Sequence, residues 1–267
     1  RDYYASRGLG DVYKRQGQSV KAHRKEIIWL KRSMLRAMVL VLALALAVLP
    51  SAAQEPGEQY LAMTFDDGPS GRFTRRLLQE LEQREAHVTF FLCGYRMEQY
   101  PDMAAEMIAA GHEIGLHGYS HTCMADMSME KLEQELCRTE ALLQEQTGTT
   151  TCLLRPPGGK RCQTVTQGAA AHGLSLITWS VDPKDWATND RDKVVQRVLD
   201  RVCDGDIILM HDMSDSSVDA ALAIIDRLEE AGYRFVTVSE LADLRGKTME
   251  AGCLYTSFHP TFTVDAN

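Results

Sequence analysis

A single stretch decides the fold of this chain: Thr64-Phe65-Asp66-Asp67-Gly68-Pro69-Ser70. An apolar run over residues 60–64 leads into two adjacent carboxylates, and Gly-Pro then stops the strand. Adjacent acids repel each other and are poor strand formers. They make sense at a strand end where a cation neutralises one and the other is held ready to take a proton. A plain surface turn is the alternative, because Asp, Gly and Pro are also turn residues.

A second polar stretch ends another apolar run: His117-Gly118-Tyr119-Ser120-His121. The two histidines are four residues apart, so one helical turn would place both imidazoles on the same face. With a carboxylate they would supply three protein ligands and leave a fourth metal position open, as a catalytic zinc site requires. Asp67, on a neighbouring strand, can provide that carboxylate. A His-x3-His pair without the carboxylate is weaker evidence for a metal site, since many such pairs are surface or core histidines.

Outward from these stretches, the chain alternates apolar strands with helical patterns. The predicted strands are 60–64, 88–92, 113–116, 152–154, 175–181, 207–210 and 234–236. The predicted helices are 74–82, 102–110, 129–146, 164–171, 192–202, 218–230 and 238–244. Pro101 stands where a helix-starting proline belongs, Ser128 is a ready N-cap, and Thr237 with Glu240 has capping-box spacing. Strands with helical crossovers predict an α/β fold with a parallel sheet, and seven such units favour a small barrel in one catalytic domain.

Polar residues gather at the ends of the predicted strands. They are Asp66 and Asp67 after the first strand, His117 after the third, Arg155 after the fourth, Asp182 and Asp185 after the fifth, and His211 after the sixth. A barrel of this kind places its site at the C-terminal ends of its strands. These residues therefore predict one shared site.

Five motifs occur in the order and spacing of a known family: TFDDGPS, HGYSH, residues 154–159 (LRPPGG), residues 181–186 (VDPKDW) and residues 209–211 (LMH). Over residues 59–244 the chain resembles the polysaccharide deacetylases, the NodB-homology group or carbohydrate esterase family 4. The resemblance implies a distorted, NodB-like (β/α)7 barrel with a divalent metal. It also implies removal of N-acetyl groups from amino sugars of peptidoglycan or chitin-like chains, with xylan esterases as relatives.

The resemblance implies roles for individual residues. Asp67, His117 and His121 would bind one divalent metal, with Zn expected and Co or Ni as alternatives. Asp66 would be the general base, fixed by Arg155, and His211 would be the general acid. Either Asp182 or Asp185 could orient His211, and Asp185, beside Trp186, is favoured. The substrate-binding residues would be Trp186, Leu209, Pro157 and Gly158.

Structural alternatives stand beside these roles. Arg155 could be a surface arginine, Trp186 a core aromatic, and His211 with Asp212 a helix N-cap pair. Two positions also depart from the family pattern. Gly118 replaces a Ser or Thr whose hydroxyl could steady the second histidine, and Gly158 replaces an aromatic residue that many members have.

The first part of the chain does not belong to the predicted domain. Residues 1–33 read as a non-native or doubtful extension. Residues 34–53 resemble a signal peptide, with basic residues before the apolar run 37–49 and small residues at 50–53. An uncleaved anchor is the alternative, and only then would the protein associate with a membrane. We therefore expect residues 54–267 to be an exported catalytic domain, extracellular or associated with the cell envelope.

Charge narrows the partners further. Of the 29 Lys and Arg and the 37 Asp and Glu, residues 1–53 hold ten and three, which leaves residues 54–267 with 19 basic and 34 acidic residues, a formal net charge of −15. Such a surface repels nucleic acid. We expect a monomer that acts on a cell-wall or chitin-like glycan.

The sequence is compatible with three functions. The first is a metal-dependent hydrolase that removes N-acetyl groups from peptidoglycan GlcNAc or MurNAc, or from chitin-like oligosaccharides. The second is an acetyl-xylan or other carbohydrate O-acetyl esterase that uses the same site. The third is a catalytically silent glycan-binding module, against which the simultaneous presence of ligands, base and acid argues.

Overall fold

The computed structural model describes residues 58–260. The predictions for the N-terminal extension and for the signal peptide or anchor lie outside these residues. Across the part that is described, no helix is both long and apolar enough to cross a membrane.

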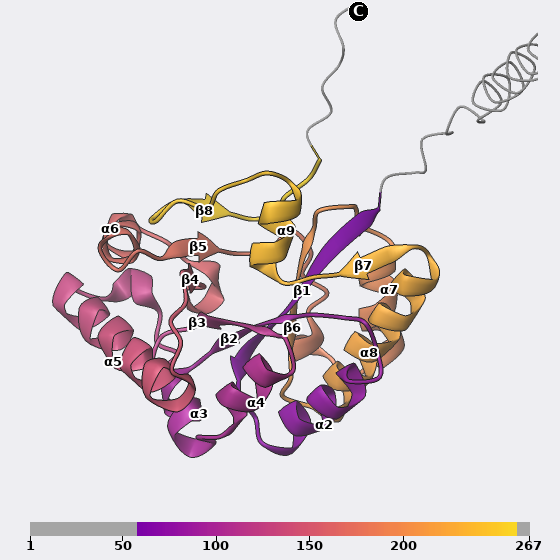
Figure 1. The fold of residues 1–267 in the computed structure, drawn as a ribbon, viewed down its shortest axis with the longest axis horizontal. Coiled ribbons are helices and arrows are strands. Elements are labelled where there is room, and N and C mark those ends of the chain that lie inside the picture. The colour runs from indigo at the N-terminus through magenta and orange to yellow at the C-terminus, as the bar shows by residue number, and fades with distance from the viewer. Residues whose placement is uncertain (1–57, 261–267) are drawn as a thin grey trace, which may run out of the picture. The chain divides into compact units, whose positions relative to one another are not determined.

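The core of the fold is one curled, parallel sheet (Figure 1). Its strands are β1 (Gln59–Gly68), β2 (Thr89–Leu92), β3 (Glu113–Leu116), β4 (Leu153–Leu154), β5 (Ser175–Ile177), β6 (Ile207–His211), β7 (Tyr233–Phe235) and β8 (Leu254–Tyr255). The order is β6-β1-β2-β3-β4-β5-β8, and β7 also pairs with β1. A bridge between Val181 and Ile208 joins the chain after β5 to β6, so the sheet curls back on itself. This is the predicted NodB-like distorted (β/α)7 barrel in a single domain.

Helices surround the sheet (Figure 1). They are α2 (Arg72–Leu81), α3 (Gly94–Gln99), α4 (Met103–Ala109), α5 (Met129–Thr147), α6 (Gln163–Ala171), α7 (Arg191–Leu199), α8 (Asp215–Glu230) and α9 (Val238–Leu244). Three single turns of 3-10 helix lie in the loops: Met124–Asp126, Pro157–Gly159 and Asp185–Ala187. The predicted caps are present, since Ser128 accepts from the Lys131 N–H and Thr237 forms a capping box with Glu240.

Alternation along β1 separates two apolar clusters. Leu61, Met63 and Phe65 belong to the larger cluster, which includes buried residues of α2 to α8, whereas Ala62 belongs to a smaller one that includes the buried residues of α9. Side chains of a strand alternate between its two faces. Thr64 and Asp66 therefore share the face of Ala62, so polar residues follow the smaller apolar cluster on this face toward the end of β1.

Several predicted boundaries were wrong. The strand predicted over 175–181 ends at Ile177, because Arg155 takes the carbonyls of Ile177 and Thr178 with its Nε and Nη2 at 3.2 and 2.9 Å. Pro101 does not start a helix, since α4 begins at Met103 after Asp102. Helix α3 and strand β8 were not predicted at all, because each is too short to show a period in the sequence.

Candidate active site

A β-bulge at the end of β1 brings the two adjacent carboxylates to the same end of the barrel. Asp66 pairs with Phe91 and Gly68 with Leu92, so Asp67 is an extra residue without a partner across the β1–β2 pair. Its φ of 71° lies in the left-handed region, which Asp tolerates better than most residues. Without a bulge, neighbouring residues of a strand would point to opposite faces. The sequence placed the acids after the strand, whereas both lie within β1.

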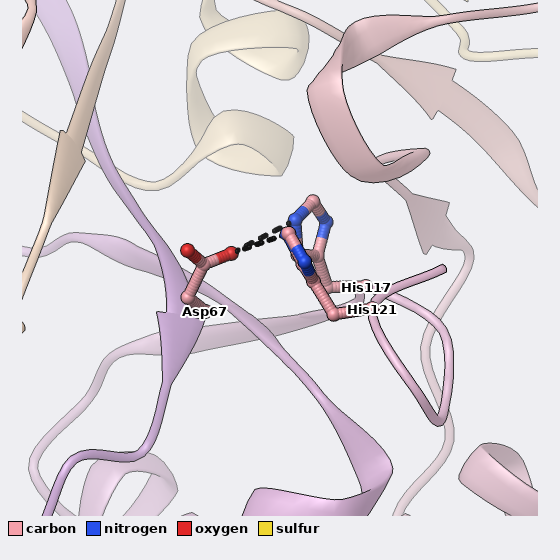
Figure 2. A group of neighbouring side chains, drawn as sticks. All are labelled: Asp67, His117 and His121. Carbon is pink, nitrogen blue, oxygen red and sulfur yellow. Dashed lines mark ion pairs between the residues drawn. The ribbon is translucent and has the colours of Figure 1, made fainter. Parts of the chain in front are cut away.

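The three residues predicted to bind a metal lie together (Figure 2). Asp67 Oδ1 is 3.3 Å from His117 Nε2 and 2.9 Å from His121 Nε2, and the imidazole centroids are 5.1 Å apart. Asp67 Oδ1 is buried, and no residue of the described chain forms a hydrogen bond with it. A carboxylate oxygen without a hydrogen-bond partner that faces two ring nitrogens fits a divalent cation, because carboxylate oxygen and imidazole nitrogen are ligands that bind zinc in proteins.

The helical turn expected between the two histidines is absent. Residues 117–120 form an irregular loop after β3, and Gly118 and His121 both have positive φ, 78° and 58°. His117 is buried, and its Nδ1 lies 2.6 Å from the carbonyl oxygen of Arg155, which leaves Nε2 turned toward Asp67. Such a contact fixes both the tautomer and the ring orientation of a ligand histidine.

Electrostatics favour an ionised Asp67. Burial opposes ionisation, but the imidazoles of His117 and His121 close to the carboxylate outweigh it and hold the pKa of Asp67 well below its usual range. The close Asp67 carboxylate in turn raises the pKa of His121. The carboxylate is therefore in the form that binds a cation.

Arg155 and Asp66 form a buried ion pair at the base of the site. Arg155 Nη1 lies 2.6 Å from Asp66 Oδ1 and 2.7 Å from Thr64 Oγ1, and the arginine is fully buried. Burial lowers the pKa of Arg155 while the Asp66 charge opposes that shift. A guanidinium keeps its proton in proteins, so Asp66 is held as an oriented carboxylate. The alternative of a surface arginine was wrong.

His211 lies across from Asp66, because β1 and β6 pair these two residues. Its Nδ1 and its backbone N–H lie 2.9 Å from the two carboxylate oxygens of Asp185. Burial opposes protonation of His211, but the Asp185 hydrogen bond and the charges of Asp185, Asp66 and Asp67 outweigh it and raise the pKa to about 9. The imidazole is therefore protonated at neutral pH and can give up a proton.

The competing interpretations of this region are resolved by contacts. Asp182 accepts from the backbone N–H of Lys184 at 2.8 Å and forms a turn, so Asp185 is the carboxylate on His211. The helix that follows His211 is capped by Ser214, so the N-cap alternative for His211 and Asp212 was wrong.

The four predicted substrate-binding residues differ in exposure. Leu209 and Pro157 are buried, whereas Gly158 is exposed and Trp186 is 65% exposed. The alternative of a core aromatic at Trp186 was therefore wrong. A Cβ at Gly158 would meet nothing within 4 Å, although its φ of 68° strains any other residue. The wall is bare there, as the sequence indicated.

Sequence reasoning missed two buried acids beside the site. Asp212 is fully buried, accepts a hydrogen bond from Thr74, and has its pKa raised to about 6 by burial. Glu135 is 3% exposed and accepts hydrogen bonds from the loop between the two histidines. The position of Asp212 beside His211 was a signal for the first. Nothing in the sequence distinguishes Glu135 from the other acids of α5.

A second group of side chains that could bind a metal ion lies on α5 and at the end of α6. The group is Cys137, Glu140 and His172, and its Glu140 Oε2 already lies 2.8 Å from His172 Nδ1. All seven cysteines are free thiols. Since Cys137 is exposed and Glu140 and His172 already satisfy each other, the Asp67 group is the better candidate for a metal.

The fold and this set of residues define a NodB-like carbohydrate esterase barrel, and the comparisons agree. A sequence model of the family described as polysaccharide deacetylase matches residues 53–177. The chain is 39% identical to a peptidoglycan-N-acetylglucosamine deacetylase of Bacillus cereus, over 69% of this chain and 88% of that protein. It belongs to the polysaccharide deacetylase family.

Two further relatives show how far the similarity extends. Peptidoglycan-N-acetylmuramic acid deacetylase PdaC of Bacillus subtilis is 34% identical over 72% of this chain, which spans only 40% of that longer protein. A family 4 acetyl xylan esterase from Clostridium thermocellum, solved in complex with a cobalt ion, is 31% identical with a TM-score of 0.69, over 74% of this chain and 98% of that one. The relatives thus include enzymes named for two different acetylated glycans.

Proposed function

We propose that this protein is an exported, metal-dependent hydrolase that removes N-acetyl groups from the amino sugars of cell-wall glycan or of chitin-like oligosaccharides. One observation carries the proposal. A carboxylate held by a buried arginine, Asp66, and an imidazole charged by an aspartate, His211, face each other across paired strands beside a three-residue ligand group. Relatives named as peptidoglycan deacetylases support the choice of glycan.

Asp67, His117 and His121 would hold the metal. When bound, a divalent cation there lowers the pKa of water and polarises the acetamide carbonyl. Two imidazole nitrogens and one carboxylate oxygen are a ligand set typical of catalytic zinc, with cobalt or nickel as alternatives.

Asp66 supplies the base. It accepts the proton of the attacking water, and Arg155 orients the carboxylate through an ion pair of 2.6 Å. The ion pair is buried, so water competes little for the carboxylate. The other two guanidinium nitrogens, Nε and Nη2, donate to the carbonyls of Ile177 and Thr178 and hold Arg155 in place.

His211 supplies the acid. An amine is a poor leaving group until it is protonated, so breaking the C–N bond requires a proton donor on the sugar side. The raised pKa of His211 keeps that proton available at neutral pH, and Asp185 fixes which ring nitrogen faces the substrate. The products are acetate and a free amino sugar.

An O-acetyl esterase is the second candidate, and the likeness to an acetyl xylan esterase favours it. Ester cleavage depends less on the acid, because an alkoxide leaves more readily than an amide anion. A silent glycan-binding module is the third candidate. The intact Asp66–Arg155 and His211–Asp185 pairs argue against it, since a binding module needs neither pair.

Acetate release from a substrate panel tests the proposal. The panel holds peptidoglycan, N-acetylglucosamine oligomers and acetylated xylan, each with the protein loaded with Zn²⁺ or Co²⁺. Asp66→Asn and His211→Ala should each lower kcat on the amide substrates by about 10²–10⁴ while metal content stays unchanged. Release from xylan alone would establish the esterase instead, and loss of metal in either variant would mean that a ligand had been mistaken for a catalyst.

A further inference from the structure

The loop between the two ligand histidines is fastened to the protein on two sides. Its carbonyls at Gly118 and Tyr119 accept hydrogen bonds from the N–H groups of Gly94 and Tyr95, at 2.9 and 3.0 Å. Its next two N–H groups point the other way, toward helix α5. Successive N–H groups of this kind form a concavity that binds an anion.

Glu135 of α5 fills that concavity. Its Oε2 accepts from the N–H groups of Tyr119 and Ser120 at 2.9 and 2.8 Å, and its Oε1 accepts from Ser120 Oγ at 2.9 Å. The side chain is 3% exposed, and Lys131 Nζ lies 3.7 Å from Oε1. A carboxylate is costly to bury unless it is hydrogen-bonded, and here the loop supplies three of those bonds.

The second histidine depends on this fastening more than the first. His117 is 1% exposed and is held through Nδ1 by a backbone carbonyl. The side chain of His121 is 43% exposed, and within the described residues its only ion-pair partner is Asp67. The direction of the His121 ring is therefore set mainly by the backbone of residues 118–120.

The surroundings of Gly118 explain why the loop is held by a residue of helix α5 and not by a side chain of its own. The resemblance led us to expect a hydroxyl at this position to steady the loop. A Cβ at Gly118 would come within 2.7 Å of Met124 Cε and 3.6 Å of Glu135 Oε2, on a backbone whose φ is 78°. A side chain at 118 would be strained and crowded, so the fastening comes from Glu135 across the loop.

We propose that Glu135 is a positioning residue that holds His121 ready for the divalent cation. The inference rests on the proposed metal site, but it concerns the protein before any metal or glycan is bound. Removal of the carboxylate leaves two part-buried N–H groups, those of Tyr119 and Ser120, without this acceptor, and the loop relaxes to satisfy them. Partners that orient metal ligands typically contribute 10–100-fold to metal affinity.

The test measures Co²⁺ affinity by competition with a chelator, in the absence of glycan. Glu135→Ala should weaken Co²⁺ binding by about 10–100-fold. Glu135→Gln should stay within about threefold of the wild-type affinity, because one amide oxygen can accept both N–H groups. Glu133→Ala removes an exposed acid from the same helix and should leave the affinity unchanged.

A second pair of measurements separates positioning from general loss of stability. Leu136→Ala opens the core beneath α5 and leaves the Glu135 carboxylate in place, so a folded Leu136→Ala variant should bind Co²⁺ as tightly as wild type. In the metal-free state, the amides of Tyr119 and Ser120 should exchange hydrogen faster in Glu135→Ala than in Leu136→Ala.

The outcomes are distinct. Equal Co²⁺ affinity of Glu135→Ala and wild type, or an equal loss in Leu136→Ala, would overturn the positioning role while the proposed function stands. Failure of the wild-type protein to bind Co²⁺ at all would overturn the proposed function and this inference with it.

Discussion

Substitution of Asp185 by asparagine should move the alkaline limit of activity. Asp185 is 3% exposed and touches His211 twice, at Nδ1 and at the backbone N–H. Asparagine keeps an oxygen for one of these contacts but removes the charge. Burial alone lowers the pKa of a histidine. Without the Asp185 charge, the pKa of His211 should therefore fall from about 9 toward its ordinary value of 6.5, since burial then opposes only the more distant charges of Asp66 and Asp67.

The size of the effect follows from the protonated fraction of His211. A group with a pKa of about 9 is almost fully protonated at pH 7, whereas one at 6.5 is about one-quarter protonated, so the kcat/KM of Asp185→Asn should fall about 4-fold. At pH 8.5 the same two values give a loss of roughly 75-fold. A cation beside Asp66 and Asp67 would offset some of the negative charge that raises the pKa of His211. In the metal-loaded protein, activity should therefore decline at alkaline pH with a pKa at or below about 9.

The assay is acetate release from an N-acetylglucosamine oligomer, measured as kcat/KM between pH 5 and 10, with NMR titration of His211 in the metal-free protein. Asp182→Asn is the matched control, because within residues 58–260 Asp182 accepts a hydrogen bond only from the nearby Lys184 N–H, so this variant should keep the alkaline limit of activity in place. A loss that is the same at every pH in Asp185→Asn, or an unmoved His211 titration, would refute the reasoning.

Three further predictions follow from the same residues. Chelation should abolish acetate release, and Zn²⁺ or Co²⁺ should restore it. Asp67→Ala should lose the bound ion, whereas Cys137→Ser should keep it. Full activity of the metal-stripped protein would contradict the proposed chemistry. Arg155→Met leaves Asp66 as an unpaired buried charge and should lower the free energy of unfolding in urea by about 3–5 kcal/mol, whereas the exposed Arg161→Met should change it by less than about 0.5 kcal/mol. Lys160 and Arg161 are exposed just beyond the Pro157–Gly159 turn. Changing both to Glu should raise the KM for anionic peptidoglycan several-fold and leave the KM for a neutral chitin oligomer unchanged. Equal effects on the two substrates would rule out a charge contact.

The sequence was sufficient for the features that depend on local pattern. The alternation of apolar runs and helical periods predicted the parallel sheet, and the bounds of β3 and α9 agree with the prediction. Motifs at strand ends predicted which residues would meet, since parallel strands present their carboxyl ends on one side of the barrel. Asp67, His117 and His121 come together for that reason.

The tertiary structure decided how those residues are held. The two histidines meet through an irregular loop rather than the helical turn that their spacing suggested, because Glu135 and the segment after β2 fix its backbone. Asp66 and Asp67 point to one site because of a bulge at Asp67, and register against a neighbouring strand cannot be read from one strand alone.

The burial of charged side chains could not be predicted from the sequence. Arg155 and Asp66 are 89 residues apart, and Glu135 lies on a helix whose other acids are mostly exposed. A sequence states that a charge is present but not whether water surrounds it. That depends on contacts between distant segments, which exist only in the folded chain, and it turns an arginine and a glutamate into parts of the site.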